Sequence, residues 1–293
     1  MKNIFRGLGI ALVTPFCEDG TVDYRALETL VEYQISNGAD FLCILATTGE
    51  TPTLTTEEKQ RIRQTIIKVA NSRVPILIGC GGNNTAAVCQ ELRNGDFIGI
   101  DGVLSVCPYY NKPTQEGLYQ HFLAISMVSP LPVVLYNVPG RTGVNLLPET
   151  TLRLARDCEN IVAVKEASGN IEQIKTILSN KPEDFDVLSG DDALTLDIIR
   201  HGGTGAISVI GNALVKETAA VIHHALEGDY AEAEKIDNTL TDLYRLIFVD
   251  GNPAGIKVIL SEMGLIKNVL RLPLVPASAK TIAEITEKIQ NVE

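Results

Sequence analysis

The sequence predicts an α/β protein of the TIM-barrel class, a (β/α)8 barrel with a C-terminal helical appendage. Eight short apolar runs rich in β-branched residues alternate with amphipathic segments, and this strand signal stops after about residue 228. A doubly wound open sheet is the alternative architecture, which the number of strands disfavours. We therefore expect a barrel domain over residues 1–228 and an α-helical domain over residues 229–293.

The expected strands follow one another with short connections and lie near residues 8–13, 41–46, 75–79, 102–107, 132–136, 161–165, 186–189 and 205–209. Three segments between them carry helix-start signals. Asp23 can cap a helix that runs to Asn37, a capping box at Thr55 to Glu58 precedes residues 60–70, and Pro148 suits a first turn. Beyond the barrel, we expect helices over residues 230–246, 253–263 and 277–289, packed on the barrel or on a partner subunit.

Composition and charge limit the kinds of partner. The net charge of −11 and the pI near 4.9 disfavour nucleic acid and anionic membrane surfaces. No apolar stretch reaches transmembrane length, and Pro15 interrupts the N-terminal apolar run, unlike the core of a signal peptide. The six cysteines form no CxxC pair and the four histidines form no ligand pattern. We therefore expect a cytoplasmic location, no disulfide framework and no metal.

Two polar residues end apolar strands. Lys165 ends the sixth expected strand and Tyr136 ends the fifth, so both side chains should emerge at the C-terminal face of the barrel. Removing an amine from water disfavours its ammonium form, and a neutral amine can form a Schiff base with a carbonyl substrate. For one strand-end lysine taken alone, a side chain that reaches out to water is the simpler interpretation.

Other reactive side chains follow the remaining strand ends. They include the segments TTGE at 47–50, PYYN at 108–111, YNVP at 136–139, RTG at 141–143, KEASG at 165–169 and SGDD at 189–192. Hydroxyls, phenols, an arginine and a lysine on one face suit carbonyl chemistry. Each segment also has a structural interpretation, namely a turn, an interface tyrosine pair, a surface charge or, at Asp191 and Asp192, a helix cap.

Taken together, these segments resemble the dihydrodipicolinate synthase, or 4-hydroxy-tetrahydrodipicolinate synthase, family. This family is part of the pyruvate-dependent class I aldolases of the N-acetylneuraminate lyase superfamily. The matching segments are 47–50 (TTGE), 108–113 (PYYNKP), 115–122 (QEGLYQHF), 136–143 (YNVPGRTG), 165–170 (KEASGN), 188–192 (LSGDD) and 205–209 (GAISV). The TTGE segment, the YN-x-P segment and the lysine indicate the aldolase group, and Arg141 with KEASG narrows the resemblance to the synthases.

The resemblance implies an enzyme that condenses pyruvate with L-aspartate 4-semialdehyde, giving 4-hydroxy-tetrahydrodipicolinate in the diaminopimelate route to lysine. It implies that Lys165 forms an imine with pyruvate and that no cofactor is needed. It further implies that Thr47, Tyr136 and Tyr110 relay protons, with Tyr110 supplied by the neighbouring subunit. The expected assembly is a homodimer or a homotetramer built as a dimer of dimers.

Four more positions correspond to substrate-binding residues of the family. By the resemblance, Thr48 contacts the carboxylate of pyruvate and Arg141 receives the carboxylate of aspartate semialdehyde, for which a fork of donors is suited. Gly190 and Ile207 correspond to positions that line the site.

A further set corresponds to the cleft in which lysine-sensitive members of the family bind L-lysine. Asn83 and Tyr109 match that cleft, but Ala87 replaces a glutamate and Lys59 replaces a histidine. We expect a vestigial allosteric cleft with weak or absent inhibition by L-lysine.

Two segments depart from the family pattern. Ala46 precedes the TTGE segment where glycine is frequent, and NPAGIK at 252–257 replaces the usual NPIPVK. Because of the second departure, the family pattern does not predict the backbone conformation around Gly255.

Two competing functions are weighed against the synthase. A sugar-acid aldolase of the N-acetylneuraminate or 2-keto-3-deoxy-gluconate lyase type would share the lysine and the tyrosine. Such relatives typically lack an arginine at the position of Arg141, so this residue discriminates between the two. A barrel without catalytic activity that serves as a binding protein is disfavoured, because every catalytic position holds a competent residue.

Overall fold

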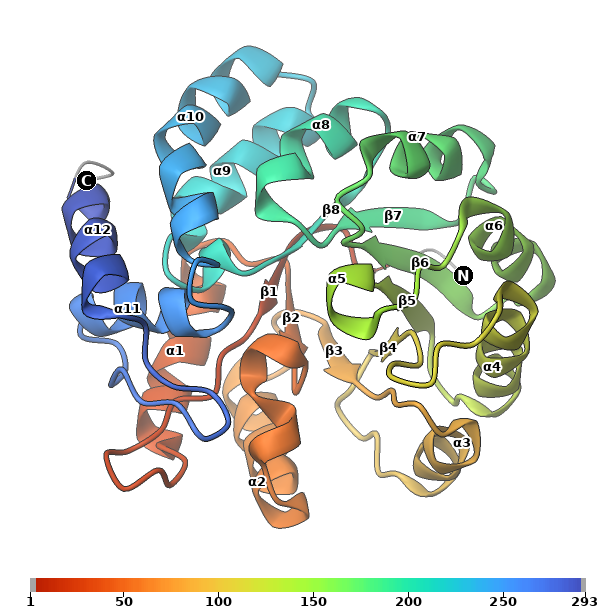
Figure 1. The fold of residues 1–293 in the computed structure, drawn as a ribbon, viewed down its shortest axis with the longest axis horizontal. Helices are drawn as coiled ribbons and strands as arrows, with labels where there is room; N and C mark the ends of the chain where they lie inside the picture. Colours follow the sequence, from red (N-terminus) through yellow and green to blue (C-terminus); the bar gives the residue numbers. More distant parts are fainter. Residues whose placement is uncertain (1–3, 291–293) are drawn as a thin grey trace.

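The computed structural model describes residues 4–290, in which eight parallel strands pair in chain order and close into a barrel (Figure 1). The strands are β1 (Gly7–Ala11), β2 (Phe41–Ile44), β3 (Ile76–Gly79), β4 (Gly102–Val106), β5 (Val133–Asn137), β6 (Ile161–Glu166), β7 (Asp186–Ser189) and β8 (Gly205–Ser208). Parallel pairing of β1 with β8 completes the barrel, so the expected closed architecture is confirmed and the open sheet is wrong.

Helices connect the strands and follow the barrel. They are α1 (Tyr24–Ser36), α2 (Thr56–Ala70), α3 (Thr85–Asn94), α4 (Gln115–Val128), α5 (Pro139–Thr142), α6 (Pro148–Asp157), α7 (Ile171–Asn180), α8 (Thr195–Arg200), α9 (Val215–Leu226), α10 (Tyr230–Leu246), α11 (Ala254–Glu262) and α12 (Ala279–Ile289). Four short 3-10 turns complete the described secondary structure of residues 4–290: η1 (Thr47–Gly49), η2 (Thr51–Thr53), η3 (Asp192–Leu194) and η4 (Ile210–Asn212). None of the helices in this part of the chain is long and apolar enough to cross a membrane.

The helix-start signals act as expected. The side chain of Asp23 accepts a hydrogen bond from the backbone N–H of Ala26 and caps α1. Thr55 and Glu58 form a reciprocal capping box, which satisfies two backbone donors that the first turn of a helix leaves free. The helix therefore begins at Thr56, before the expected residue 60.

Several strands end at other residues than the apolar pattern predicts. β2 ends at Ile44 because Leu45 adopts a left-handed conformation (φ 50°) that turns the chain out of the sheet. β5 and β6 each extend one residue further, since Asn137 and Glu166 pair in register. β8 ends at Ser208 because the next backbone N–H, that of Val209, donates to the Asp192 carboxylate instead of to a strand.

The C-terminal helices share the core of the barrel. Figure 1 shows α10, α11 and α12 together on one flank of the molecule. Leu240 of α10 and Ile259 of α11 are fully buried and belong to the same apolar cluster as Leu8 and Ile10 of β1. This packing fits the expectation that the appendage has no separate core. The division into two domains at residue 228 stays a prediction.

Gly255 has a clear structural role in α11. A Cβ atom at this position would lie 2.5 Å from the Cα atom and 2.7 Å from the carbonyl carbon of Ile247. Only glycine allows the helix to pack this closely on the backbone at the end of α10. The departure from the family pattern therefore allows a close helix contact.

Candidate active site

A cavity of ≈ 530 Å³ opens at the C-terminal ends of β2, β3, β4 and β5. It brings together five of the residues singled out from the sequence: Thr47, Tyr136, Arg141, Tyr109 and Lys59. Asn252, Pro273 and Leu274 of the C-terminal segment complete one side of it. The expected gathering of reactive side chains on one face of the barrel is therefore observed for this group, and the other predicted site residues lie around or outside the cavity.

Lys165 lies next to Tyr136, which lines the cavity, but is not itself part of the lining. The two residues pair in register on β6 and β5, and the Lys165 Nζ atom lies 4.4 Å from the centre of the Tyr136 ring. Both side chains are buried. Within residues 4–290 the Lys165 amine has no ion pair or hydrogen bond, so no carboxylate holds it in place. Burial also raises the pKa of the nearby Cys43 thiol to about 11, which keeps that thiol protonated beside the amine.

Gly190 and Ile207 lie at the interior of the barrel. A Cβ atom at Gly190 would lie 2.9 Å from Lys165 Cε and 2.8 Å from Ala167 Cβ, so glycine leaves the space that the lysine stem occupies. Ile207 is buried on β8 in the same interior apolar cluster as Tyr136. Neither residue lines the cavity, but both shape the space around the amine and the phenol.

The loop after β2 carries the two threonines. Thr47 begins the η1 turn and lines the cavity, whereas Thr48 is buried and its hydroxyl oxygen accepts a hydrogen bond from Asn252 Nδ2 at 2.9 Å. Thr14, in the segment after β1, contacts the same turn, because its hydroxyl donates to the carbonyl of Gly49 at 2.7 Å.

Arg141 and Tyr110 are both exposed, in different settings. Arg141 stands on the short helix α5 and lines the cavity. Tyr110 follows β4 in a left-handed conformation (φ 74°) with 88% of its surface exposed, and it does not line the cavity of its own chain. A phenol this exposed can join a buried relay only if another surface covers it.

The comparisons with known proteins decide the family. The family model described as the dihydrodipicolinate synthetase family matches residues 4–292. The chain belongs to this family. The resemblance that the sequence motifs indicated is therefore confirmed.

Individual relatives of the dihydrodipicolinate synthetase family cover nearly the whole chain. The 4-hydroxy-tetrahydrodipicolinate synthase of Phocaeicola vulgatus is 58% identical over 276 residues, which make up 94% of this chain and 93% of that protein. The dihydrodipicolinate synthase structure from Thermotoga maritima matches with a TM-score of 0.96 at 41% identity, over 99% of each chain. The structure from Cyanidioschyzon merolae, which has lysine bound, matches with a TM-score of 0.94 at 38% identity, over 99% of each chain. These relatives support the synthase and not a sugar-acid aldolase.

One polar network beside Lys165 and Tyr136 was not predicted from the sequence. The buried carboxylate of Glu166 accepts hydrogen bonds from Asn137 Nδ2 at 2.9 Å, Gln173 Nε2 at 3.0 Å and the backbone N–H of Ser168 at 3.1 Å. Burial raises the pKa of Glu166, and these donors oppose the shift. Because Asn137 and Glu166 directly follow Tyr136 and Lys165, the network fixes the two strand ends that carry them. The polar residue that directly follows each of them, in Tyr136-Asn137 and Lys165-Glu166, was a sequence signal for this network.

Two of the four residues of the expected allosteric cleft line the cavity. Tyr109 and Lys59 line it, and the side-chain amide of Asn83 donates to the Tyr109 carbonyl at 3.3 Å. Ala87 lies in the first turn of α3, which Asn84 caps. Among residues 4–290, no group of three or more histidine, cysteine, aspartate or glutamate side chains could hold a metal ion.

Proposed function

We propose that this chain condenses pyruvate with L-aspartate 4-semialdehyde to give 4-hydroxy-tetrahydrodipicolinate, a lyase-class reaction of lysine biosynthesis. One observation carries the proposal: the buried amine of Lys165 lies against the ring of Tyr136, which lines the same cavity as Arg141. The names of the relatives support the same reaction.

The chemistry begins with covalent capture of pyruvate. The amine of Lys165 attacks the ketone carbon, and loss of water leaves an imine. The protonated imine draws electrons from the neighbouring methyl group, which loses a proton to give an enamine. The enamine carbon then attacks the aldehyde carbon of the second substrate, and the aldehyde oxygen takes up a proton. The amino group of that substrate next attacks the imine carbon, which closes the ring and breaks the bond to the Lys165 nitrogen. The lysine itself supplies the electron sink, so the scheme requires no cofactor.

Proton transfer in this scheme is assigned to Tyr136, Thr47 and Tyr110. Two observations support this assignment: the Lys165 Nζ atom lies 4.4 Å from the centre of the Tyr136 ring, and Thr47 lines the same cavity as Tyr136. A phenol ionises far above neutral pH, so a hydrogen-bonded chain is needed to make transfer rapid. We assign Tyr110 to the site of a neighbouring subunit.

Substrate binding is assigned to Thr48 and Arg141. Thr48 would donate to the pyruvate carboxylate, and the Arg141 guanidinium would bind the carboxylate of aspartate semialdehyde at the cavity rim. Gly190 and Ile207 would shape the space around the imine.

Borohydride trapping tests the proposal. Incubation with pyruvate and borohydride should add the mass of a reduced pyruvyl group to Lys165, as located by peptide mass spectrometry. Lys165→Ala should abolish the adduct and nearly all condensation activity. Lys175→Ala, at a half-buried lysine of α7 that pairs with Glu172, is the matched control and should label normally. Label on another lysine in the wild-type chain would contradict the mechanism.

The proposal extends to assembly and location. An exposed Tyr110 that serves a second site requires at least a homodimer, and a homotetramer of two such dimers is expected. A reducing cytoplasm fits the free cysteines of the described residues, five of which are buried.

A further inference from the structure

The loop that carries Thr47 and Thr48 combines a short turn with two left-handed residues. Its η1 turn is three residues long and lies between Leu45 (φ 50°) and Glu50 (φ 51°). Left-handed backbone is unfavourable for residues other than glycine, and a single 3-10 turn is weak. The position of the loop therefore depends on contacts from other segments.

The C-terminal segment supplies most of these contacts. The carboxylate of Glu50 is buried, and its Oε1 atom lies 2.5 Å from Lys257 Nζ. Its Oε2 atom accepts a hydrogen bond from the backbone N–H of Arg271 at 3.0 Å. Two residues earlier in the loop, Thr48 accepts its hydrogen bond from Asn252. Segments that lie more than 200 positions apart in the sequence are thereby joined at the mouth of the barrel.

Lys257 is itself fixed in one geometry. Its side chain is fully buried, its Nζ atom donates to the carbonyl of Val269 at 2.9 Å, and the same atom lies 4.3 Å from the centre of the Phe16 ring. Burial lowers the pKa of Lys257, and the Glu50 carboxylate opposes that shift. A buried ion pair with further hydrogen bonds is suited to fix a geometry, whatever its net effect on stability.

Asn252 also determines how Thr48 can act. The amide nitrogen of asparagine only donates, so the Thr48 oxygen is the acceptor in this contact. The hydroxyl hydrogen of Thr48 therefore remains free to donate elsewhere. A donor is what a pyruvate carboxylate requires. Asn252 lines the cavity, so this contact lies at its wall.

We propose that Asn252 and Lys257 are positioning residues of the condensation. They hold the loop of Thr47 to Glu50 in place from the segment that follows the barrel, Asn252 through Thr48 and Lys257 through Glu50. The inference rests on the proposed function, because it assigns pyruvate binding to Thr48.

The first test is Asn252→Asp, which preserves the shape of the side chain and replaces the donor by an acceptor. Thr48 must then donate to the new carboxylate and loses its donor for pyruvate. We expect the KM for pyruvate to rise about tenfold or more, and the KM for aspartate semialdehyde to change by less than about twofold.

The second test separates positioning from stability. Lys257→Met alone leaves the buried Glu50 charge without a partner and should lower the melting temperature. Glu50→Gln combined with Lys257→Met removes both charges and should recover much of that loss. The KM for pyruvate should nevertheless stay raised about fivefold or more in the double variant, because the loop has lost its ionic anchor. A purely structural pair would recover both properties together.

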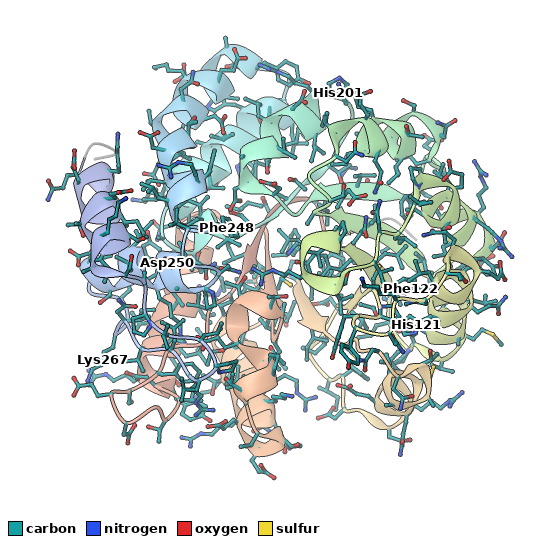
Figure 2. All side chains as sticks on the ribbon, in the orientation of Figure 1. His121, Phe122, His201, Phe248, Asp250 and Lys267 are labelled. Carbon is teal, nitrogen blue, oxygen red and sulfur yellow. The ribbon has the colours of Figure 1, made fainter. Side chains whose placement is uncertain are left out.

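Lys267→Met is the matched control, since it makes the same substitution in an exposed pair with Glu18 at the edge of the molecule (Figure 2). It should leave both KM values unchanged. Borohydride trapping at Lys165 in the wild-type chain tests the proposed function separately. If trapping succeeds while Asn252→Asp and the double variant both keep the wild-type KM for pyruvate, the positioning role is wrong and the proposed function stands.

Discussion

We expect the choice of the second substrate to depend on the side chain of Arg141. This residue borders the cavity from α5, and Lys165 is not part of the cavity lining. Arg141→Ala should therefore reduce kcat/KM for aspartate semialdehyde by about a hundredfold or more, since a two-pronged charged contact is lost. Pyruvate trapping at Lys165 should continue at a rate close to wild type. Comparable losses in both half-reactions would indicate that Arg141 supports the fold of the loop instead.

We expect Lys59 and Ala87 to weaken the response to L-lysine. Lys59 and Tyr109 both line the cavity, where the cation of Lys59 would repel the ammonium groups of a bound lysine. Ala87 offers no carboxylate to pair with such a group, which removes about 1.5–3 kcal/mol of binding free energy. We predict weak or absent inhibition by L-lysine at millimolar concentration in a steady-state titration. Strong saturable inhibition would mean that another carboxylate enters the cleft.

His121 should make the stability of the fold depend on pH. It lies beside Phe122 on α4 (Figure 2), its Nδ1 atom is 2.8 Å from the Thr85 hydroxyl, and burial lowers its pKa to about 4. The unfolded chain binds this proton near pH 6.5, so the neutral ring stabilises the fold above that pH.

Stability should therefore fall as the pH drops from about 6.5 towards 4, by about 1–2 kcal/mol at pH 5 from this residue. Urea unfolding at pH 7 and pH 5 measures the change. His121→Gln should show a flatter dependence than the wild-type chain. His201→Gln, at an exposed position beyond α8, should leave the slope as it is. If His121→Gln shows the same dependence of the unfolding free energy on pH as the wild-type chain, His121 is not the source of that dependence.

For helices and strands, the sequence predicts those features that nearby residues determine. The apolar runs predicted all eight strands, and Asp23 and Thr55 marked two helix starts correctly. The end of β2 was not predictable, because Leu45 adopts a left-handed conformation that an apolar residue rarely takes. No local pattern could show that Asn252 contacts Thr48, since the two residues lie 204 positions apart.

The site likewise has parts that the sequence predicts and parts that depend on the three-dimensional fold. Strand alternation is enough to place Lys165 and Tyr136 side by side, since paired strands end together. The Glu166 network needed the register between β5 and β6, which depends on how the barrel closes. The roles of the individual site residues remain predictions for the experiments above.

The contact between α10 and α11 yields a stability prediction. In Gly255→Ala the new methyl group meets backbone atoms of Ile247, which cannot rotate away as a side chain can. We expect a loss of about 1–3 kcal/mol in the free energy of unfolding, the usual cost of overpacking a dense interior. Gly140→Ala, in a helical position with open space around it, is the control and should be close to neutral. Equal stabilities of the two variants would show that the helices can separate slightly.

The whole molecule should work only as an assembly. Because Tyr110 is exposed and lies outside the cavity of its own chain, a single protomer lacks one member of the proposed relay. Lys165→Ala and Tyr110→Phe protomers should each be nearly inactive, and mixing them should restore activity, since a mixed dimer contains one complete site. Native mass spectrometry checks that mixed dimers form. Mixed dimers without activity would place Tyr110 in the site of its own chain.

The bond between Glu50 and Lys257 has a consequence for the order in which this protein is made. A ribosome releases residue 50 about 200 positions before residue 257, and the barrel strands with Lys165 and Tyr136 emerge in between. A nascent chain that has just completed its barrel thus already carries the amine of Lys165 and the phenol of Tyr136. The loop of Thr47 to Glu50 still lacks its contact with Lys257. We expect catalytic competence to arise late in translation, once α11 and Arg271 have emerged and docked. Incomplete chains would then expose an amine without the loop that presents pyruvate to it.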